Sequence, residues 1–298
     1  QRVSLGRNDL LIRTFPNMKT IIAVILYNTQ IDDSETIKQL AVNVCDNCIL
    51  IIVNNGPKKI NKNSAVLDIL VREYIGVEIR EYIENKPLSW IYNEVLNGFD
   101  SDRYVFFDDD SKIDCDFFIK LKLYYNDSID VQIPVIYEVS DGQRYYPVVD
   151  GGVYKGCDGS VISQNNILSI GSGLVIYKSL ISKFNKLNLS LFDERFALYG
   201  VDFSFFRRIE MVKRKYSIKI QNVSFIEHSL SRVNTHYSIY RYRERLYDAV
   251  LTTRFYSKNK TSSFFNLARI MIKELIKFKV RNIFLIVKVY VIGKHPRC

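Results

Sequence analysis

The chain has 298 residues, of which 47% are apolar and 25% are charged. This balance is typical of a folded protein and excludes a wholly disordered chain. No apolar run reaches the roughly 18–20 residues that a membrane-spanning helix needs. The formal net charge of +10 is uneven, because residues 1–202 carry 21 basic and 27 acidic side chains while residues 203–298 carry 21 and 5. We therefore expect two differently charged parts.

Strand-like and helix-like segments alternate after Met18. Short apolar runs predict strands at 21–27, 49–53, 77–83, 104–107 and 131–139. Apolar residues at helical spacing predict helices between them, at 34–44, 64–75, 88–96 and 115–125. Ser34 opens the first of these helices, and Asp114 can cap the last. This order predicts an α/β fold whose mostly parallel sheet is flanked by helices and binds ligands at the carboxyl ends of its strands.

The cysteines are few and scattered, at positions 45, 48, 115, 157 and 298. Residues 1–17 lack the apolar core and cleavage site of a secretory signal, and we interpret them as an N-terminal extension or an appended segment. We therefore expect reduced thiols in a cytoplasm. The pair Cys45 and Cys48 has no second Cys/His pair at ligand spacing, so a structural or incidental role is favoured over zinc binding.

Three consecutive carboxylates, Asp108, Asp109 and Asp110, follow the strand expected at 104–107. They repel one another, and a divalent cation would relieve the repulsion. A solvated turn is the alternative, since Asp is a common turn residue. His228, at the end of another strand-like run, is a candidate further ligand or an ordinary hydrogen-bonded histidine.

Two further segments are of interest. Asp202 precedes an amphipathic helix, where a capping carboxylate would be unremarkable. Gly171 and Gly173 precede the apolar run 174–177, where glycine permits either a close approach of the backbone to a ligand or a tight turn.

Taken in order, these motifs resemble the inverting glycosyltransferases of family 2, which have the GT-A fold, and especially their rhamnosyltransferase-like and galactofuranosyltransferase-like members. The resemblance covers about residues 18–256. The matching pieces are VILYN (24–28), VNNG (53–56), ENKPLSWIYN (84–93), FFDDDS (106–111), GSGLVIY (171–177), FDERFALYGVD (192–202), IEHSLSR (226–232) and YRYRERLY (240–247).

The resemblance implies a metal-dependent transfer of a sugar from a nucleotide-diphosphate donor, UDP- or dTDP-linked, to a hydroxyl of a saccharide acceptor. It implies a GT-A catalytic domain at 18–232, followed by a basic helical region at 233–298. Mn²⁺ or Mg²⁺ would be held by Asp108, Asp110 and His228, and Asp202 would be the general base. The implied nucleotide-sugar contacts are Tyr27, Asn28, Asn54, Asn85, Lys86, Asn93 and Asp109. The implied acceptor contacts are Trp90, Gly173, Asp193 and Glu194.

Alternatives accompany some of these assignments. Trp90 could be plain core, and Asp193 and Glu194 could be structural. The sequence also departs from the family pattern: Asn54 stands where Asp is usual, Pro87 and Trp90 replace small residues, and Val201 replaces an acid before the base. Loss of that negative neighbour would alter the pKa of Asp202.

The basic region contains an apolar and cationic stretch at 263–292. A single helix there would place Arg269, Lys273, Lys277 and Arg281 on one face and Leu267, Met271, Leu275 and Phe278 on another. Such a helix suits an anionic membrane surface, and the alternative is a helix packed on the catalytic domain. No recognised nucleic-acid module accompanies the charge, so we expect no nucleic-acid partner.

We therefore expect a peripheral protein at the inner face of the cytoplasmic membrane, acting on a lipid-linked acceptor in O-antigen or capsule assembly. A sugar-nucleotidyltransferase is the first rival, but the stretch 28–34 after the first strand has no Gly, Lys or Arg for a phosphate loop. A non-catalytic membrane-bound adaptor is the second, and the joint presence of Asp108, Asp110, Asp202 and His228 disfavours it. The sugar, the linkage and the oligomeric state stay open.

Overall fold

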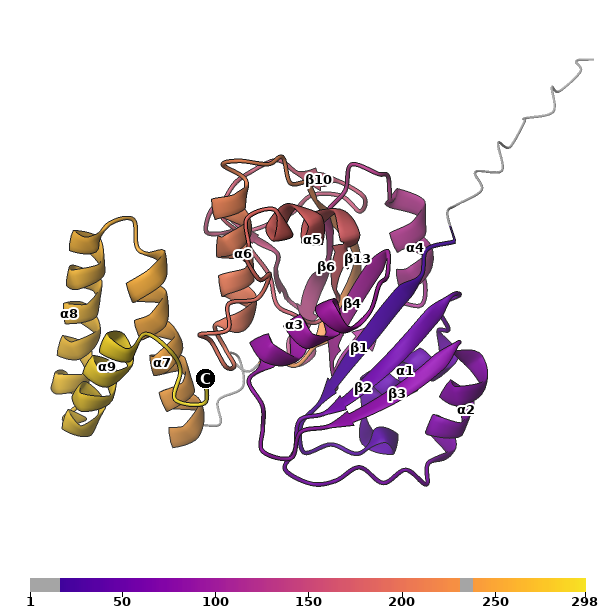
Figure 1. Ribbon diagram of the computed structural model, residues 1–298, viewed down its shortest axis with the longest axis horizontal. Helices are drawn as coiled ribbons and strands as arrows, with labels where there is room; N and C mark the ends of the chain where they lie inside the picture. The colour runs from indigo at the N-terminus through magenta and orange to yellow at the C-terminus, as the bar shows by residue number, and fades with distance from the viewer. Residues whose placement is uncertain (1–16, 231–237) are drawn as a thin grey trace, which may run out of the picture.

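A computed structural model describes residues 17–230 and 238–298 and has a twisted mixed sheet at its centre (Figure 1). The order across this sheet is β10 (Val161–Ile162), β13 (Ile220–His228), β6 (Val131–Glu138), β12 (Leu174–Tyr177), β4 (Arg103–Asp108), β1 (Thr20–Leu26), β2 (Cys48–Asn54) and β3 (Gly76–Glu81). Strands β3, β2, β1 and β4 are parallel, as are β6 and β13, whereas β12 runs antiparallel to both its neighbours. The mostly parallel sheet predicted from the sequence is confirmed.

Short strands extend this sheet and form a second one. β5 (Lys112–Ile113) pairs with β13, and β7 (Arg144–Tyr146) pairs with β6. The small sheet contains β11 (Ile167–Leu168), β8 (Val148–Val149) and β9 (Gly152–Val153). All of these short strands except β5 lie in the segment between β6 and β12, where the sequence predicts no strand.

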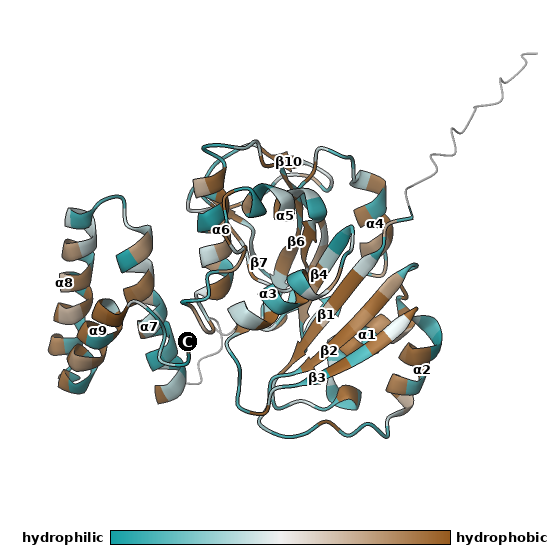
Figure 2. Cartoon of the chain, viewed as in Figure 1, coloured by the Kyte–Doolittle hydropathy of each residue, from teal (hydrophilic) through white to brown (hydrophobic). Residues whose placement is uncertain are grey.

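Helices cover both faces of the central sheet. The bounds are η1 (Ile31–Asp33), α1 (Glu35–Val42), α2 (Ala65–Glu73), α3 (Leu88–Gly98), α4 (Phe117–Tyr124), α5 (Lys178–Asn185) and α6 (Val201–Val212). Alternate residues of β1 enter two different cores: Ile21 packs with residues of α3, α5 and α6, and Ile22 packs with residues of α1, α2 and α4. Burial on both faces explains why β1 and β2 are uniformly apolar (Figure 2).

Serine caps begin two of the helices. Ser34 accepts from the Ile37 N–H, as its position predicts, and Ser64 accepts from the Leu67 N–H. The expectation that Asp114 caps α4 is wrong, because the N-cap is Asp116 and its side chain makes no capping bond. The Asp114 carboxylate instead accepts from Lys120 Nζ at 2.6 Å and from Ser224 Oγ at 2.8 Å.

Cys45 and Cys48 are joined by a disulfide, with their Cα atoms 5.7 Å apart. The expectation of reduced thiols throughout is therefore wrong for this pair, because the turn from α1 into β2 folds the two residues back onto each other. Among the described residues the free cysteines are Cys115, Cys157 and Cys298.

The C-terminal region folds as three helices: α7 (Ile239–Tyr256), α8 (Lys260–Ile276) and α9 (Val280–Ile292). The single helix expected over 263–292 is wrong, since the chain turns at Phe278, whose φ is 54°. The turn is held by Glu274, which is buried and accepts from the Tyr242 hydroxyl and, at 2.5 Å, from Asn282 Nδ2. No helix in the described part of the chain is long and apolar enough to cross a membrane.

Helix α7 packs on the catalytic domain, and α8 and α9 pack on α7 (Figure 1). Leu246, Val250 and Leu251 of α7 belong to the same core as Phe196 and Phe205 of the catalytic domain. The packed alternative, made for 263–292, holds for one side of those helices, since Ile286 and Val289 of α9 belong to this core and Leu267, Ile270 and Met271 of α8 pack against it. The expected boundary between residues 232 and 233, like the extension at 1–17 apart from Asn17, lies outside the described residues.

Candidate active site at the carboxyl edge of the sheet

The carboxyl ends of neighbouring strands meet at one edge, as the sequence predicts. In the register of the sheet, Ile25 of β1 pairs with Asp108 of β4, and Leu26 pairs with Asn54 of β2. Tyr27 follows directly and is 51% exposed. The backbone N–H of Asn28 donates to the Gly56 carbonyl at 2.7 Å, which ties the ends of β1 and β2 together.

The start of α1 fixes the acidic turn. Thr36 Oγ1 donates to the Asp108 carbonyl at 2.5 Å, and Ser34 Oγ donates to the Asp109 carbonyl at 2.8 Å. The Asp109 carboxylate accepts from the Tyr27 N–H at 3.1 Å, so it lies over the end of β1. Because the backbone of the turn is satisfied by these bonds, the Asp108 and Asp110 carboxylates are free to project from the edge.

His228, 118 residues after Asp110 in the sequence, lies between these two carboxylates. Its Nδ1 is 3.0 Å from Asp110 Oδ1, and its Nε2 is 3.7 Å from Asp108 Oδ2. Ser111 Oγ lies 3.1 Å from the same Nδ1 and 2.6 Å from Ser172 Oγ, so a buried hydroxyl pair supports the ring. The three residues predicted as metal ligands are thus brought together.

The charges in this cluster are strongly coupled. Burial and the charges of Asp110 and Asp109 raise the pKa of Asp108 to about 6, against the opposing effect of His228. Burial lowers the pKa of His228, but its hydrogen bond to Asp110 and the charge of Asp108 outweigh this, and the pKa is raised overall. Carboxylates and an imidazole are donor types that Mg²⁺ and Mn²⁺ accept. Asp110 approaches Nδ1 of the ring and Asp108 approaches Nε2, so the imidazole lies between the two acids. Among the described residues, the acidic group whose donor atoms all lie within 4.8 Å of one another is Asp114, Cys115 and Asp116.

Asp202 lies in the first turn of α6, two residues after the N-cap Gly200. A Cβ at Gly171 would approach Asp202 Oδ1 to 2.7 Å and the Tyr92 hydroxyl to 3.1 Å, so only glycine permits this close packing. Burial and the charge of Asp108 together raise the pKa of Asp202 to about 7. A carboxylate with a pKa near neutrality is suited to general-base catalysis.

A residue of α7 supplies the negative neighbour that Val201 removes. A Cβ at Gly200 would approach Asp248 Oδ1 to 2.1 Å, so this carboxylate lies against the start of α6. Its charge is a further cause of the raised pKa of Asp202. Sequence reasoning missed Asp248, which lies in the Tyr/Arg-rich helix far along the chain. The absence of an acid at position 201 was the signal that another acid could lie beside Asp202.

The remaining residues predicted for the donor divide into exposed and occupied side chains. Tyr27 and Asn28 are exposed at the edge. Asn54 is buried and shapes its own turn, because Nδ2 donates to the Lys58 carbonyl at 2.7 Å and Oδ1 accepts from the Gly56 N–H at 3.0 Å. Its neighbour Asn55, in the same VNNG segment, has a buried Oδ1 with no hydrogen-bond partner among the described residues.

The segment that contains Asn85 and Lys86 lies beside this turn. Asn55 Nδ2 donates to Asn85 Oδ1 at 3.2 Å and to the Lys86 carbonyl at 3.0 Å. Lys86 forms an ion pair with Glu94. Asn93 faces elsewhere: its Nδ2 donates to the Phe192 carbonyl and its Oδ1 accepts from the Phe192 N–H, at 3.0 and 3.1 Å. Its placement therefore supports a structural role.

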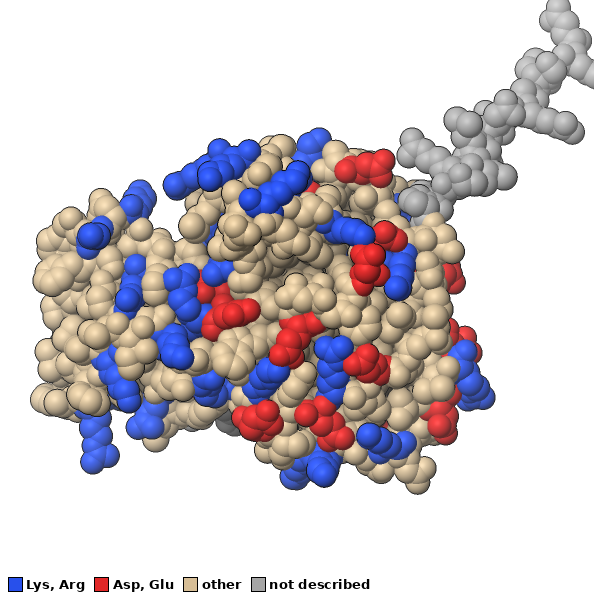
Figure 3. Space-filling model, viewed as in Figure 1, with Lys and Arg blue, Asp and Glu red and all other residues tan. Residues whose placement is uncertain are grey.

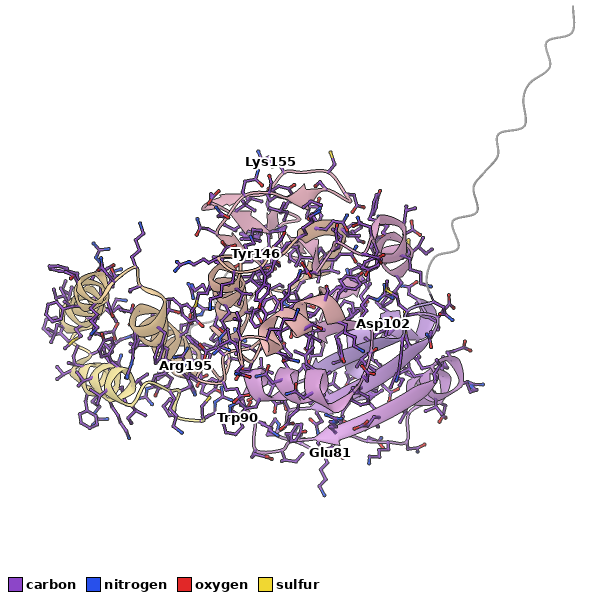
Figure 4. The ribbon with its side chains drawn as sticks, turned by 45° about the horizontal axis from the view of Figure 1, so that its top comes forward. Glu81, Trp90, Asp102, Tyr146, Lys155 and Arg195 are labelled. Atoms are coloured by element: carbon purple, nitrogen blue, oxygen red, sulfur yellow. A yellow bond between two sulfur atoms is a disulfide. The ribbon has the colours of Figure 1, made fainter. Side chains whose placement is uncertain are left out.

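The residues predicted for the acceptor lie on the segment after α5 and on α3. Trp90 Nε1 donates to the Glu194 carbonyl at 3.1 Å, and Glu194 is exposed (Figure 4 labels Trp90 and the neighbouring Arg195). Asp193 is fully buried and bonded to Arg195, Arg208 and Tyr256, which favours its structural alternative. At Gly173 (φ 76°) a Cβ would approach Pro134 Cγ to 2.5 Å, so packing within the sheet requires glycine there.

Two hollows in the described part of the chain lie away from these residues. Their volumes are about 330 and 260 Å³, and both adjoin the amino end of β4, near Asp102 and Lys178. The acidic residues lie at the opposite end of that strand. Asp108, Asp202 and His228, whose pKa values are raised, lie at that carboxyl edge and line neither hollow.

No protein-family model matches the sequence, and no curated protein matches it. Solved structures do match its fold. The crystal structure of S. aureus TarS has a TM-score of 0.55 at 13% identity, covering 86% of this chain and 43% of that one. TarS 1–349 in complex with UDP and in complex with UDP-GlcNAc each has a TM-score of 0.53 at 12% identity, covering 86% of this chain and 72% of those.

The chain thus spans less than half the length of the first of these structures. At such low identity the likeness concerns the fold, which is that of the GT-A glycosyltransferases, as the sequence motifs predicted. Activity and substrates are a separate question, which depends on the site.

Proposed function

We propose that the protein is a metal-dependent, inverting glycosyltransferase of family 2, which moves a sugar from a nucleotide-diphosphate donor to a saccharide hydroxyl. One observation carries the proposal: a carboxylate with a pKa near 7 and the acidic turn that would hold the metal both lie against the loop that contains Gly171 and Ser172. Gly171 packs against Asp202. The hydroxyl of the adjacent Ser172 accepts from the Asp108 N–H and lies 2.6 Å from the Ser111 hydroxyl. A base and a site for a diphosphate are thus adjacent.

On the donor side, Asp108, Asp110 and His228 would hold Mn²⁺ or Mg²⁺. The ion, when bound, neutralises the negative charge that develops on the departing diphosphate. Tyr27, Asn28 and the buried acceptor of Asn55 would contact the nucleoside, and Asp109 would lie nearer the ribose or sugar. TarS 1–349 has been solved with UDP and with UDP-GlcNAc, which supports a UDP donor, with dTDP as the other candidate.

On the acceptor side, Asp202 would accept the proton of the attacking hydroxyl. That oxygen would then attack the anomeric carbon from the face opposite the leaving diphosphate, so the configuration inverts in a single displacement. Trp90 and Glu194 would contact the acceptor sugar. The high pKa of Asp202 makes the carboxylate a stronger base than an exposed aspartate.

We further propose that the acceptor is lipid-linked and that the protein works at the inner face of the cytoplasmic membrane, in O-antigen or capsule assembly. The support is the basic, apolar C-terminal region, whose residues 249–298 contain Glu274 as their single acidic residue. That acid is buried, so the exposed charge of α8 and α9 is cationic.

A donor panel followed by product analysis tests the reaction. UDP-sugars and dTDP-sugars, each with Mn²⁺ and with EDTA, should raise the melting temperature only when the ion and the correct donor are both present. Incubation of that donor with membrane-derived acceptor should release the nucleoside diphosphate. Release of pyrophosphate from a nucleoside triphosphate and a sugar phosphate would instead identify a nucleotidyltransferase and overturn the proposal.

A further inference from the structure

The outward sides of α8 and α9 carry two apolar stripes. On α8 the stripe contains Phe264, Phe265, Ile272, Leu275 and Ile276, all at least 51% exposed. On α9 it contains Val280, Phe284, Val287 and Val291, spaced by four, three and four residues. Phe278, at the turn between the helices, is 92% exposed. The outer side of an ordinary surface helix is polar, so this surface has the composition of an interaction site.

The inner sides of the same helices are already used. Leu267, Ile270 and Met271 of α8 pack against the core, and Ile286 and Val289 of α9 are buried in it. The hairpin is therefore apolar both inside and outside (Figure 2). The outer apolar stripes are not needed to hold the hairpin on α7, so they are available to contact a partner other than the described residues.

Cationic side chains border both stripes. On a helical projection at 100° per residue, Arg269, Lys273 and Lys277 follow directly beside the α8 stripe, and Arg281 and Lys288 beside the α9 stripe. Glu274, the one acid on these helices, is buried against Asn282. The end of the molecule formed by these helices shows blue and tan in Figure 3, with red side chains confined to the neighbouring parts.

We propose that the α8–α9 hairpin docks on an anionic phospholipid surface, with Phe278 and the two apolar stripes among the lipid headgroups and acyl chains and the bordering lysines and arginines on the phosphates. Apolar residues flanked by cations are the combination that an anionic bilayer interface complements. A second copy of the chain would bring the same cationic borders together and be repelled, so charge favours lipid over self-association.

Docking by this hairpin would hold the candidate active site near the membrane. Helix α7 lies between the hairpin and the catalytic domain (Figure 1). Its Asp248 lies against Gly200, two residues before Asp202. The hairpin itself and α7, two helix layers of about 10 Å each, thus separate the docking surface from the segment that carries the base. This inference gives the proposed lipid-linked acceptor a physical route to the site, but the hairpin would dock whether or not the transfer reaction is as proposed.

Vesicle binding tests the docking surface independently of transfer. Co-sedimentation of the 298-residue chain with phosphatidylglycerol/phosphatidylcholine vesicles should show binding, whereas pure phosphatidylcholine should bind at least about fivefold less. Phe278→Asn should weaken binding about tenfold while keeping the fold, because Asn tolerates the left-handed conformation at this position better than Phe does. The double variant Arg269→Glu/Lys273→Glu should weaken it by about fivefold or more, since each cation contributes about 1 kcal/mol near such a surface.

A test substitution on the hairpin is paired with a matched control substitution on the catalytic domain. Phe284→Gln on α9 should weaken binding, and Ile119→Gln on α4, where the side chain is 64% exposed, should not. Lys38→Glu on α1 controls for charge. Equal binding by wild type and Phe278→Asn, or equal binding to neutral and anionic vesicles, would overturn the proposal. The proposal would also be overturned if the chain bound no vesicles but formed dimers in sedimentation velocity, and if Phe284→Gln abolished those dimers.

Discussion

The surroundings of Asp202 set both its chemistry and its effect on stability. The pKa of this carboxyl is raised from 3.8 to about 7 by burial and by the charge of Asp108. Because the folded state holds the proton more tightly than the unfolded state, Asp202 stabilises the fold below about pH 4 relative to higher pH. That contribution is lost as the pH rises through about 7. A base that is ready at neutral pH thus destabilises the protein that holds it.

Replacement of Asp202 by Asn should therefore stabilise the protein while abolishing transfer. In metal-free buffer the free energy of unfolding of Asp202→Asn should exceed that of wild type by about 4 kcal/mol at pH 8, from a pKa shift of about 3 units at about 1.4 kcal/mol each, and the difference should vanish near pH 4. Chemical denaturation at a series of pH values measures this, with product release as the activity readout. A variant that is less stable than wild type at pH 8 would show that the pKa of Asp202 is not raised, and a variant that retains transfer would show that Asp202 is not the base.

Single residues also show what sequence alone could and could not predict. Asp108, Asp110 and His228 were identifiable because strand ends converge at one edge, and a family resemblance linked them. The side chains of Asn54 and Asn93 match motif positions, yet their amides bond the backbone of their own or a neighbouring segment. Which amide is left for a ligand depends on three-dimensional neighbours, which motif spacing does not record.

At the scale of elements, the segment between α5 and α6 is held to the C-terminal helices by one buried acid. Asp193 contacts Arg195 at 2.6 Å, Arg208 at 3.2 Å and the Tyr256 hydroxyl at 2.6 Å. Burial alone would raise its pKa, but the bonds from Arg195 and Tyr256 and the charge of Arg208 lower it overall. This network links α6, α7 and the strand-like segment that carries Glu194.

Asp193→Ala should cost about 3–5 kcal/mol of unfolding free energy near pH 7, because it leaves buried Arg208 without its carboxylate. Since the folded pKa of Asp193 lies below 3.8, its contribution is complete above that pH and is lost as the pH falls through the folded value. Denaturant melts at pH 7 and pH 3 measure the difference. The exposed neighbour provides a control, Glu194→Ala, which should change stability by about 0.5 kcal/mol or less; equal losses for both variants would contradict the network.

Most strands and helices of the catalytic domain were predictable because hydrophobic periodicity reports burial. Two wrong predictions, the cap of α4 and the single helix at 263–292, have causes in hydrogen bonds that hydrophobic periodicity does not report. Asp114 is drawn away from capping by Lys120 and Ser224, a partner 110 residues distant. The apolar pattern at 263–292 shows no break at Phe278, because apolar residues occur on both sides of the turn. The break depends on the buried bond between Glu274 and Asn282, which no pattern of apolar residues reveals.

At the scale of the whole molecule, the uneven charge of the sequence corresponds to two parts with separate roles. The acidic residues 1–202 contain most of the sheet and its acidic turn, whereas the basic residues 203–298 contain β13 with His228 as well as the three helices α7, α8 and α9 on one side (Figure 3). The two parts share a core through α7, whose Asp248 reaches the start of α6. A charge count predicted the division, but this contact between the parts could only come from the structure.

The central claim is that the acidic edge binds a nucleoside diphosphate through a divalent ion. Isothermal titration of UDP into the wild-type chain, with Mn²⁺ and with EDTA, tests it most directly, alongside Asp110→Ala, His228→Ala and the exposed control Asp127→Ala. We predict binding that requires Mn²⁺, that weakens at least about tenfold in the first two variants, and that is unchanged in the third. UDP affinity that is the same with Mn²⁺ and EDTA, or that survives intact in Asp110→Ala and His228→Ala, would contradict the account.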